Sequence, residues 1–160
     1  MWDRKQGNEK SDPTGQNHMV HATTFRVRFG ELDPYNHVNH AVYVAWFEAG
    51  RGEALDSVDM SLSSMAELGF QVVVTDLSVQ YKVPGKAGDI VTVETWVSEI
   101  GGARSTWSQR ITRPDPESGV PTVLCLGEVR AGCTNSEGRP TRMPPELKAA
   151  LSRLSPPEAL

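Results

Sequence analysis

Five stretches of the chain alternate hydrophobic with polar residues, which is the pattern of a β-strand with one buried face. In the first stretch Phe25, Val27 and Phe29 point to one side, and the residues between them are polar or small. The stretches that this pattern predicts as strands are residues 23–33, 70–83, 90–99, 103–113 and 122–134. Three consecutive valines, residues 72–74, are typical of a strand that is covered on both faces. Turn-forming sequences separate the last four strands, so we expect these strands to be antiparallel neighbours.

Between the first two strands the hydrophobic spacing changes to that of a helix. Asn39 is a good N-cap, and Val42 and Trp46 after it recur on one helical face. We therefore predict a long and largely buried helix that begins after Asn39. Glycine weakens a helix, so we expect Gly50 and Gly52 to be there because they allow close packing against a sheet.

Two shorter helices are also predicted. Residues 57–69 contain the first, which Ser61 or Ser64 caps and Gly69 ends. The second begins at residues 144–145 and places three leucines on one face, namely Leu147, Leu151 and Leu154.

The order of these elements predicts the fold class. A strand, a long helix, a short helix and four further strands indicate an α+β protein, with one curved five-stranded antiparallel sheet around a central helix. One helix covers only one face of such a sheet. The other face, with residues such as Trp96 or Trp107, then needs another cover, and homo-oligomerisation supplies it.

Length and composition indicate one globular domain with polar ends. A chain of 160 residues is one domain by its length. Residues 1–20 are polar and predict a disordered or loosely attached tail, residues 21–143 form the domain, and residues 144–160 form a short C-terminal helix and tail.

Charge and hydropathy exclude several classes of partner. The formal net charge of −4 gives no basis for binding nucleic acid. No hydrophobic run approaches the ~20 residues of a membrane span, and the N-terminus lacks the apolar core of a signal peptide, so we expect a cytoplasmic protein with no membrane partner. Cys125 and Cys133 lie along one predicted strand, too far apart for a disulfide, and are expected to be free thiols.

The chemistry that the sequence indicates lies where the first strand meets the long helix. Pro34 disfavours a helical conformation at Asp33, so we expect Asp33 at the last position of the strand. The first N–H groups of the helix, near Asn39 and His40, have no partner inside the helix and carry the positive end of its dipole. A carboxylate next to a site that binds an oxyanion is an arrangement suited to acyl transfer.

The segment DPYNHVNHAVYVAWFEAGR, residues 33–51, resembles the signature of hotdog-fold thioesterases of the 4-hydroxybenzoyl-CoA thioesterase type. It also resembles the DxNxHVNN segment of acyl-ACP thioesterases. Asp33 falls on the catalytic aspartate of the family, and His37 and Asn39 fall on its HVN motif. Tyr35 and His40 stand where the acyl-ACP enzymes have asparagine.

The resemblance implies a hotdog dimer or dimer of dimers that hydrolyses an acyl-CoA or acyl-carrier-protein thioester to the free acid, without a cofactor or metal. Asp33 and His37 are then the expected catalytic residues. Asn39, His40 and Tyr43 are expected at the oxyanion hole and the substrate.

Three questions stay open at the level of sequence. Asp33 can act as a nucleophile or as a general base that activates water. A hotdog domain can bind acyl-CoA without hydrolysing it. The spacing of Asp33, His37 and His40 also allows a two-histidine, one-carboxylate metal site, although a spacing in a loop is a weak signal.

Overall fold

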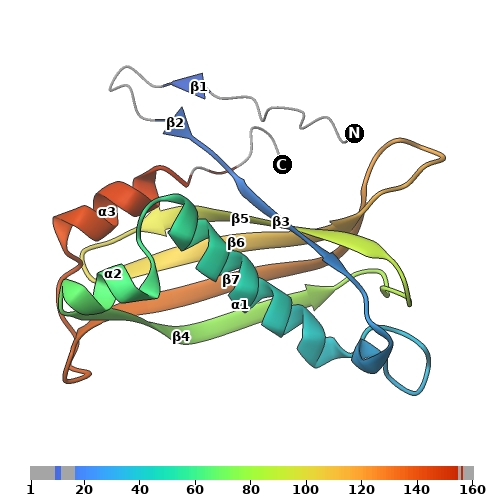
Figure 1. Cartoon of the computed structure of the whole chain (residues 1–160), viewed down its shortest axis with the longest axis horizontal. Coiled ribbons are helices and arrows are strands. Elements are labelled where there is room, and N and C mark those ends of the chain that lie inside the picture. Colours follow the sequence, from blue (N-terminus) through green and yellow to red (C-terminus); the bar gives the residue numbers. More distant parts are fainter. Residues whose placement is uncertain (1–9, 12–16, 155, 157–160) are drawn as a thin grey trace.

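The computed structural model describes residues 10–11, 17–154 and 156. The elements are β1 (Lys10–Ser11), β2 (Asn17–His18), β3 (His21–Arg26), the 3-10 helix η1 (Phe29–Glu31), α1 (His40–Ser57), α2 (Leu62–Glu67), β4 (Phe70–Tyr81), β5 (Ile90–Ile100), β6 (Arg104–Arg113), β7 (Thr122–Asn135) and α3 (Pro145–Ser152). Five of the strands form one antiparallel sheet in the order β3-β5-β6-β7-β4 (Figure 1). The predicted α+β fold, a five-stranded antiparallel sheet with one long helix, is confirmed.

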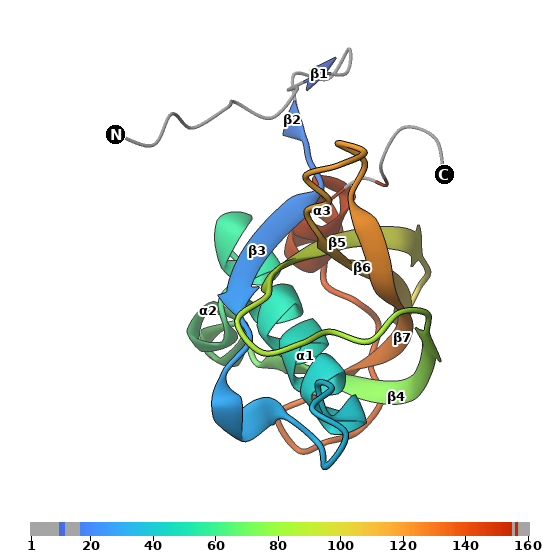
Figure 2. The ribbon, with the colours of Figure 1, turned by 90° about the vertical axis from the view of Figure 1, so that its right-hand side faces the viewer.

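The sheet curves around α1, which crosses one of its faces (Figure 2). Glycines allow the two layers to approach closely. A Cβ atom on Gly127 of β7 would lie 2.7 Å from the Phe47 ring, and one on Gly50 would lie 3.0 Å from Thr95 Oγ1. The prediction of close packing therefore holds for Gly50. It is wrong for Gly52, since a Cβ there would meet nothing within 4 Å.

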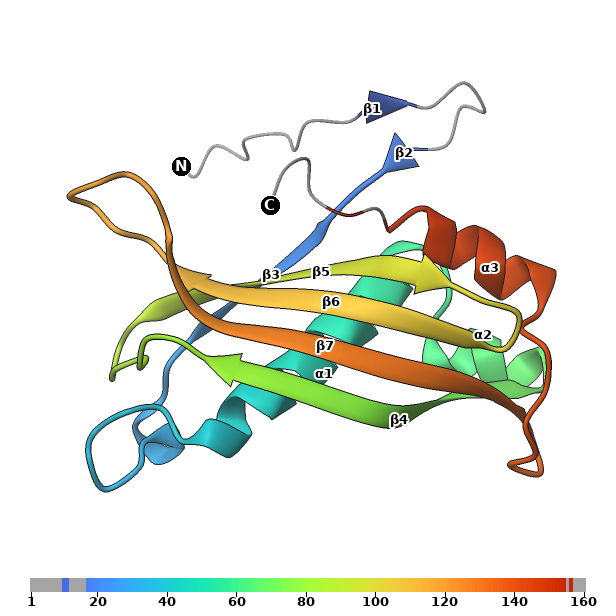
Figure 3. The same ribbon diagram turned by 180° about the vertical axis from the view of Figure 1, so that it is seen from behind.

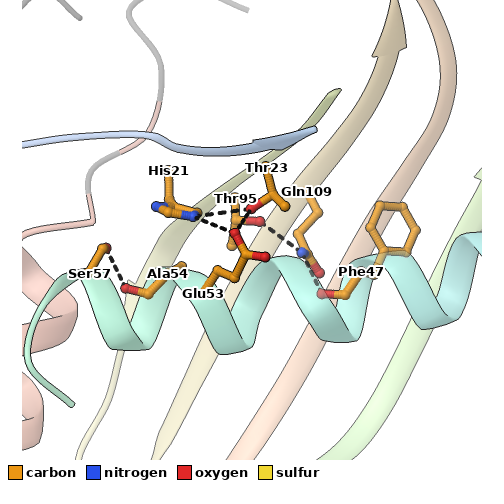
Figure 4. Close-up of polar contacts among 8 residues, drawn as sticks. All are labelled: His21, Thr23, Phe47, Glu53, Ala54, Ser57, Thr95 and Gln109. Atoms are coloured by element: carbon orange, nitrogen blue, oxygen red, sulfur yellow. Dashed lines mark hydrogen bonds and ion pairs between the residues drawn. The ribbon is translucent and has the colours of Figure 1, made fainter. Parts of the chain in front are cut away.

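A buried polar network also joins α1 to the sheet (Figure 4). The Gln109 side-chain amide donates to the Phe47 carbonyl at 2.8 Å and to the Thr95 hydroxyl at 2.9 Å. Its Oε1 accepts from Arg51 at 2.8 Å, and burial lowers the pKa of Arg51. Because each of these buried groups has a partner, the network fixes the helix on the sheet at little desolvation cost.

Figure 3 shows the face of the sheet that α1 does not cross. Many side chains on this face are polar, among them Ser78, Gln80, Ser108 and Glu128. Arg110 Nε and Glu94 Oε2 form an ion pair there at 2.6 Å. Trp96 pairs with Ser108 on this face, as predicted. Trp107 does not lie there, because it pairs with Val97 and belongs to the core cluster under α1. The expectation that a second apolar layer must cover this face therefore loses part of its basis.

Strand β4 lies at an edge of the sheet and is more exposed than its sequence predicts. Val73 and Val74 are 44% and 50% exposed within this chain. Successive residues of a strand point to opposite faces, and both of these side chains are exposed, whereas Val72 packs against the core. The prediction that residues 72–74 are covered on both faces is therefore wrong for a single chain.

Helix α3 packs its apolar face into the core cluster beside α1. Leu147 and Leu151 of this helix are buried in that cluster, as is Leu154 just after it. These are the three leucines predicted from their helical spacing. Val97 of β5 donates its N–H to the Leu154 carbonyl at 3.0 Å. The predicted tail, residues 1–20, lies mostly outside the described residues. Within its described part, β1 and β2 pair with each other.

One predicted boundary is wrong. Strand β3 ends at Arg26 rather than Asp33, because η1 follows it and the Glu31 carboxylate accepts the Arg28 N–H at 2.7 Å. The start of helix α2 is as predicted, with Ser61 as the cap, because its hydroxyl accepts the Ser64 N–H at 3.1 Å. A local side-chain acceptor thus sets each boundary.

Candidate active site

The segment from Glu31 to Asn39 forms a small hairpin at one end of the molecule, next to the start of α1 (Figure 1). Asn39 N–H donates to the Glu31 carbonyl at 2.8 Å, Leu32 pairs with Val38, and Asp33 N–H donates to the His37 carbonyl at 2.7 Å. The tip turns at Asn36, whose φ is 59°. Asp33 therefore sits in this hairpin, directly opposite His37, and not in a strand of the main sheet.

The Asp33 carboxylate is fixed by the hairpin and only half-buried. Its Oδ1 atom accepts the N–H of Tyr35 at 2.9 Å and the N–H of His37 at 3.1 Å. Its Oδ2 atom has no hydrogen-bond partner within the described residues. One oxygen thus holds the orientation of the carboxylate, and the other is free to meet a ligand.

Helix α1 starts at His40, three residues after His37. Asn39 caps it as predicted, with its Oδ1 accepting the Ala41 N–H at 2.9 Å. The backbone N–H of His40, the first residue of the helix, has no hydrogen-bond partner in the described part of the chain. Helix geometry gives this group a partial positive charge, so it can donate to an oxyanion.

Tyr43 is placed differently from the other predicted site residues. It is 3% exposed, and its hydroxyl accepts the Gly85 N–H at 2.9 Å. Gly85 in turn accepts the Val38 N–H through its carbonyl at 2.9 Å. Tyr43 therefore supports the hairpin from the core, and burial raises the pKa of its hydroxyl.

Tyr81 and Gly85 are part of this arrangement and were missed at the level of sequence. The Tyr81 hydroxyl donates to the His40 carbonyl at 2.9 Å. Gly85 must lack a side chain, because a Cβ atom there would lie 2.9 Å from Val38 Cγ2. Both residues are more than 40 positions from the hairpin in the sequence, so no local pattern relates them to it. The Pro84-Gly85 pair indicates only a turn.

His37 and His40 do not assemble with Asp33 into a metal site. Within the described part of the chain, no group of three or more His, Cys, Asp or Glu side chains is arranged to hold a metal ion. The ligand set that the spacing allowed is therefore not formed. The side chain of His37 is half-buried and that of His40 is exposed.

A surface cleft of about 630 Å³ lies beside the hairpin. It runs between β3, η1 and Trp46 of α1, and Phe25 stacks on Trp46 at 6.1 Å between ring centroids. Its lining consists of Thr24, Phe25, Arg26, Val27, Arg28, Phe29, Glu31 and Trp46. The cleft combines an aromatic wall with two exposed arginines, which suits a ligand that has both apolar and anionic parts.

A five-stranded antiparallel sheet around one helix, with an aspartate hairpin at the start of that helix, defines a hotdog-fold protein. The chain belongs to the Thioesterase-like superfamily, whose model matches residues 27–151.

Similar proteins of known sequence and structure agree with this assignment. The chain is 32% identical over 133 residues to the acyl-CoA thioesterase YbgC of Haemophilus influenzae, covering 81% of this chain and 92% of the relative. It is 28% identical over 130 residues to the chloroplastic acyl-acyl carrier protein thioesterase ATL2 of Arabidopsis thaliana, covering 81% of this chain and 66% of the relative. The crystal structure of a DHNA-CoA thioesterase from Staphylococcus aureus superposes with a TM-score of 0.73 and 27% identity, covering 84% of this chain and 89% of that one.

None of the helices in the described residues is long and apolar enough to span a membrane.

Proposed function

We propose that this protein hydrolyses an acyl thioester of coenzyme A or of an acyl carrier protein to the free acid. The observation that carries the proposal is the hairpin itself. It holds one oxygen of Asp33 with two backbone N–H groups, leaves the other oxygen unpartnered, and leads within seven residues to a free N–H at the start of α1. Membership of the Thioesterase-like superfamily, and relatives named as acyl-CoA and acyl-ACP thioesterases, support the substrate class.

The thioester carbonyl oxygen binds at the His40 N–H, near the Asn39 cap. In the general-base route, Asp33 takes a proton from a water molecule as the water oxygen bonds to the carbonyl carbon. The negative charge that forms on the carbonyl oxygen is stabilised by the helix start. When the carbonyl re-forms, the carbon–sulfur bond breaks, and the thiolate that leaves takes up the proton. His37 lies opposite Asp33 and orients water or substrate.

In the nucleophilic route, Asp33 itself bonds to the carbonyl carbon and expels the thiolate, giving a mixed anhydride that water then hydrolyses. Both routes use the same carboxylate oxygen and the same oxyanion donor. In a single turnover in ¹⁸O-labelled water, label found in the Asp33 carboxylate identifies the nucleophilic route, because attack of water on the anhydride at the aspartyl carbon leaves solvent oxygen in the protein.

The cleft beside the hairpin accommodates part of the substrate. Phe25 and Trp46 offer an aromatic wall, and Arg26 and Arg28 offer positive charge at the rim. These features fit a thioester that has an apolar acyl group and an anionic carrier.

The experiment that tests the function is hydrolysis of a panel of acyl-CoA and acyl-carrier-protein thioesters by the purified protein and by Asp33→Asn. Asparagine has nearly the shape of aspartate but is neither an anion nor a base, so we expect kcat to fall by about 10²–10⁴-fold or more. Thermal unfolding of both proteins controls for folding. Binding of acyl-CoA by the wild-type protein without turnover would instead identify a non-catalytic acyl-CoA-binding domain.

A further inference from the structure

Tyr81, the last residue of β4, links the edge of the sheet to the start of α1. Its hydroxyl donates to the carbonyl oxygen of His40 at 2.9 Å, although the two residues are 41 positions apart in the sequence. The side chain remains half exposed. Within the described part of the chain, it is the only hydrogen bond between β4 and the first residue of α1.

The direction of the Tyr81 hydroxyl is fixed by its neighbours. The Tyr81 ring meets the Tyr43 ring edge-on, with 5.4 Å between centroids and 74° between planes. The Tyr43 hydroxyl is itself held by Gly85, which pairs with Val38 of the hairpin. The start of α1 is thus held from two sides, by the hairpin through Val38 and by the sheet through Tyr81.

The helix does not need this bond to satisfy its own backbone. A carbonyl in the first turn already accepts a hydrogen bond from the N–H four residues later, so Tyr81 occupies its second lone pair. A half-exposed hydroxyl can bond to water equally well. Burial raises the pKa of Tyr81, so its hydroxyl keeps its proton and remains a donor at neutral pH. The bond therefore adds geometric restraint at His40 more than it adds stability.

We propose that Tyr81 is a positioning residue for thioester hydrolysis, because its hydroxyl holds the first residue of α1 so that the free His40 N–H points at the substrate carbonyl. This inference rests on the proposed function. Tyr81 does not contact the reacting atoms; it acts through the backbone of His40.

The test compares Tyr81→Phe with Ser152→Ala. Phenylalanine keeps the ring against Tyr43 and removes only the hydroxyl. Ser152 is a matched control in α3, at the other end of the molecule from the hairpin (Figure 1), because its hydroxyl also donates to a backbone carbonyl, that of Ala149 at 2.8 Å. Each variant is assayed for kcat, KM and thermal midpoint, and amide hydrogen exchange is followed at Ala41 and Val42, whose N–H groups are both bonded to Asn39.

We expect Tyr81→Phe to lower kcat about tenfold while KM changes by less than about twofold, since misplacement of an oxyanion donor affects the transition state more than the bound substrate. Exchange at Ala41 and Val42 should be faster than in Ser152→Ala, and the thermal midpoints of the two variants should be similar. An unchanged kcat, or a rise in KM alone, would overturn the proposal.

The exchange measurement separates this inference from the proposed function. If the wild-type protein hydrolyses no thioester, the proposed function fails, and a faster exchange in Tyr81→Phe alone cannot rescue a catalytic role for Tyr81. If the wild-type protein is active and Tyr81→Phe exchanges and turns over like Ser152→Ala, only the positioning role is wrong.

Discussion

At the scale of single residues, Asn39 and His40 are neighbours that contribute through different atoms. Asn39 uses its side chain, which accepts the Ala41 N–H and ends the hairpin at the helix start. His40 contributes its backbone N–H, while its imidazole is exposed and has no hydrogen bond within the described residues. A site built on a backbone group tolerates changes of the side chain at that residue, provided that the cap beside it is intact.

This difference predicts opposite outcomes for two substitutions. His40→Asn should keep most of the activity, since the N–H is unchanged. Asn39→Ala should cost about 0.5–2 kcal/mol of stability through the lost cap, and should lower kcat because the first turn of α1 frays. The measurements are kcat/KM and the free energy of unfolding for both variants. A folded His40→Asn as inactive as Asp33→Asn would mean that the imidazole itself takes part in the reaction.

At the scale of elements, the contact between α1 and β7 depends on the absence of a side chain. A Cβ on Gly127 would lie 2.7 Å and 2.8 Å from two atoms of the Phe47 ring, closer than real Cβ contacts. The Phe47 ring is fully buried, so it has no room to move aside. The close packing of α1 on β7 therefore requires glycine at position 127.

We expect Gly127→Ala to destabilise the fold by about 1–3 kcal/mol, the usual cost of overpacking a core. Gly132→Ala serves as the control on the same strand, since its Cβ would be at an ordinary 3.6 Å from the nearest atom. Chemical denaturation of both variants measures the difference. Equal stability of the two would show that α1 can shift on the sheet.

The same strand carries a buried thiol that makes the fold sensitive to alkali. Cys125 is fully buried, and burial raises its pKa from 9.0 to about 12. The unfolded chain therefore loses this proton at a lower pH than the folded chain does, and the folded state binds more protons between these two values. Stability should then be complete below about pH 9 and should fall as the pH rises toward 12. The raised pKa of Tyr43 acts in the same direction.

Urea unfolding at about pH 8 and about pH 10 tests this expectation, with Cys125→Ala as the comparison. The variant should be less stable at the lower pH, because it leaves a cavity, but its stability should decline less between the two pH values. A decline of the same size in both proteins would assign the alkaline sensitivity to other groups.

At the scale of the whole molecule, β4 is an edge strand with exposed apolar side chains, and burying them against another chain would be favourable. Exposed apolar side chains lie along it, namely Val73, Val74, Leu77 and Tyr81. An exposed, apolar edge strand tends to pair with another chain. The polar open face of the sheet needs no such cover, so we place the predicted homo-oligomer contact at β4.

We expect light scattering at micromolar concentration to return a mass of at least twice 17.5 kDa. Val74→Lys should lower the mass toward that of one chain, since it places a charge on the edge. The control is Val120→Lys, a substitution at an exposed position in the loop between β6 and β7, which should leave the mass unchanged. A wild-type mass near 17.5 kDa would contradict the prediction.

The sequence by itself determined the elements and the location of the chemistry. Alternation and helical spacing are local properties, so the five strands, the long helix and the leucine face of α3 could be read from them. The Asn39 cap could be predicted for the same reason, because the cap and the N–H that it accepts are two residues apart. The resemblance of residues 33–51 located the candidate aspartate.

The tertiary structure alone decided how these parts meet. Strand β3 ends early because Glu31 binds the backbone of Arg28 and starts η1, a competition that strand propensity does not report. The even spacing of Trp107 and Ile111 indicates that they share one face of the sheet, but only the tertiary structure shows that this face is the one under α1. Tyr81 and Gly85 reach the hairpin from β4 and the turn after it. Such contacts depend on the relative placement of elements far apart in sequence, and hydrophobic periodicity carries no information about that placement.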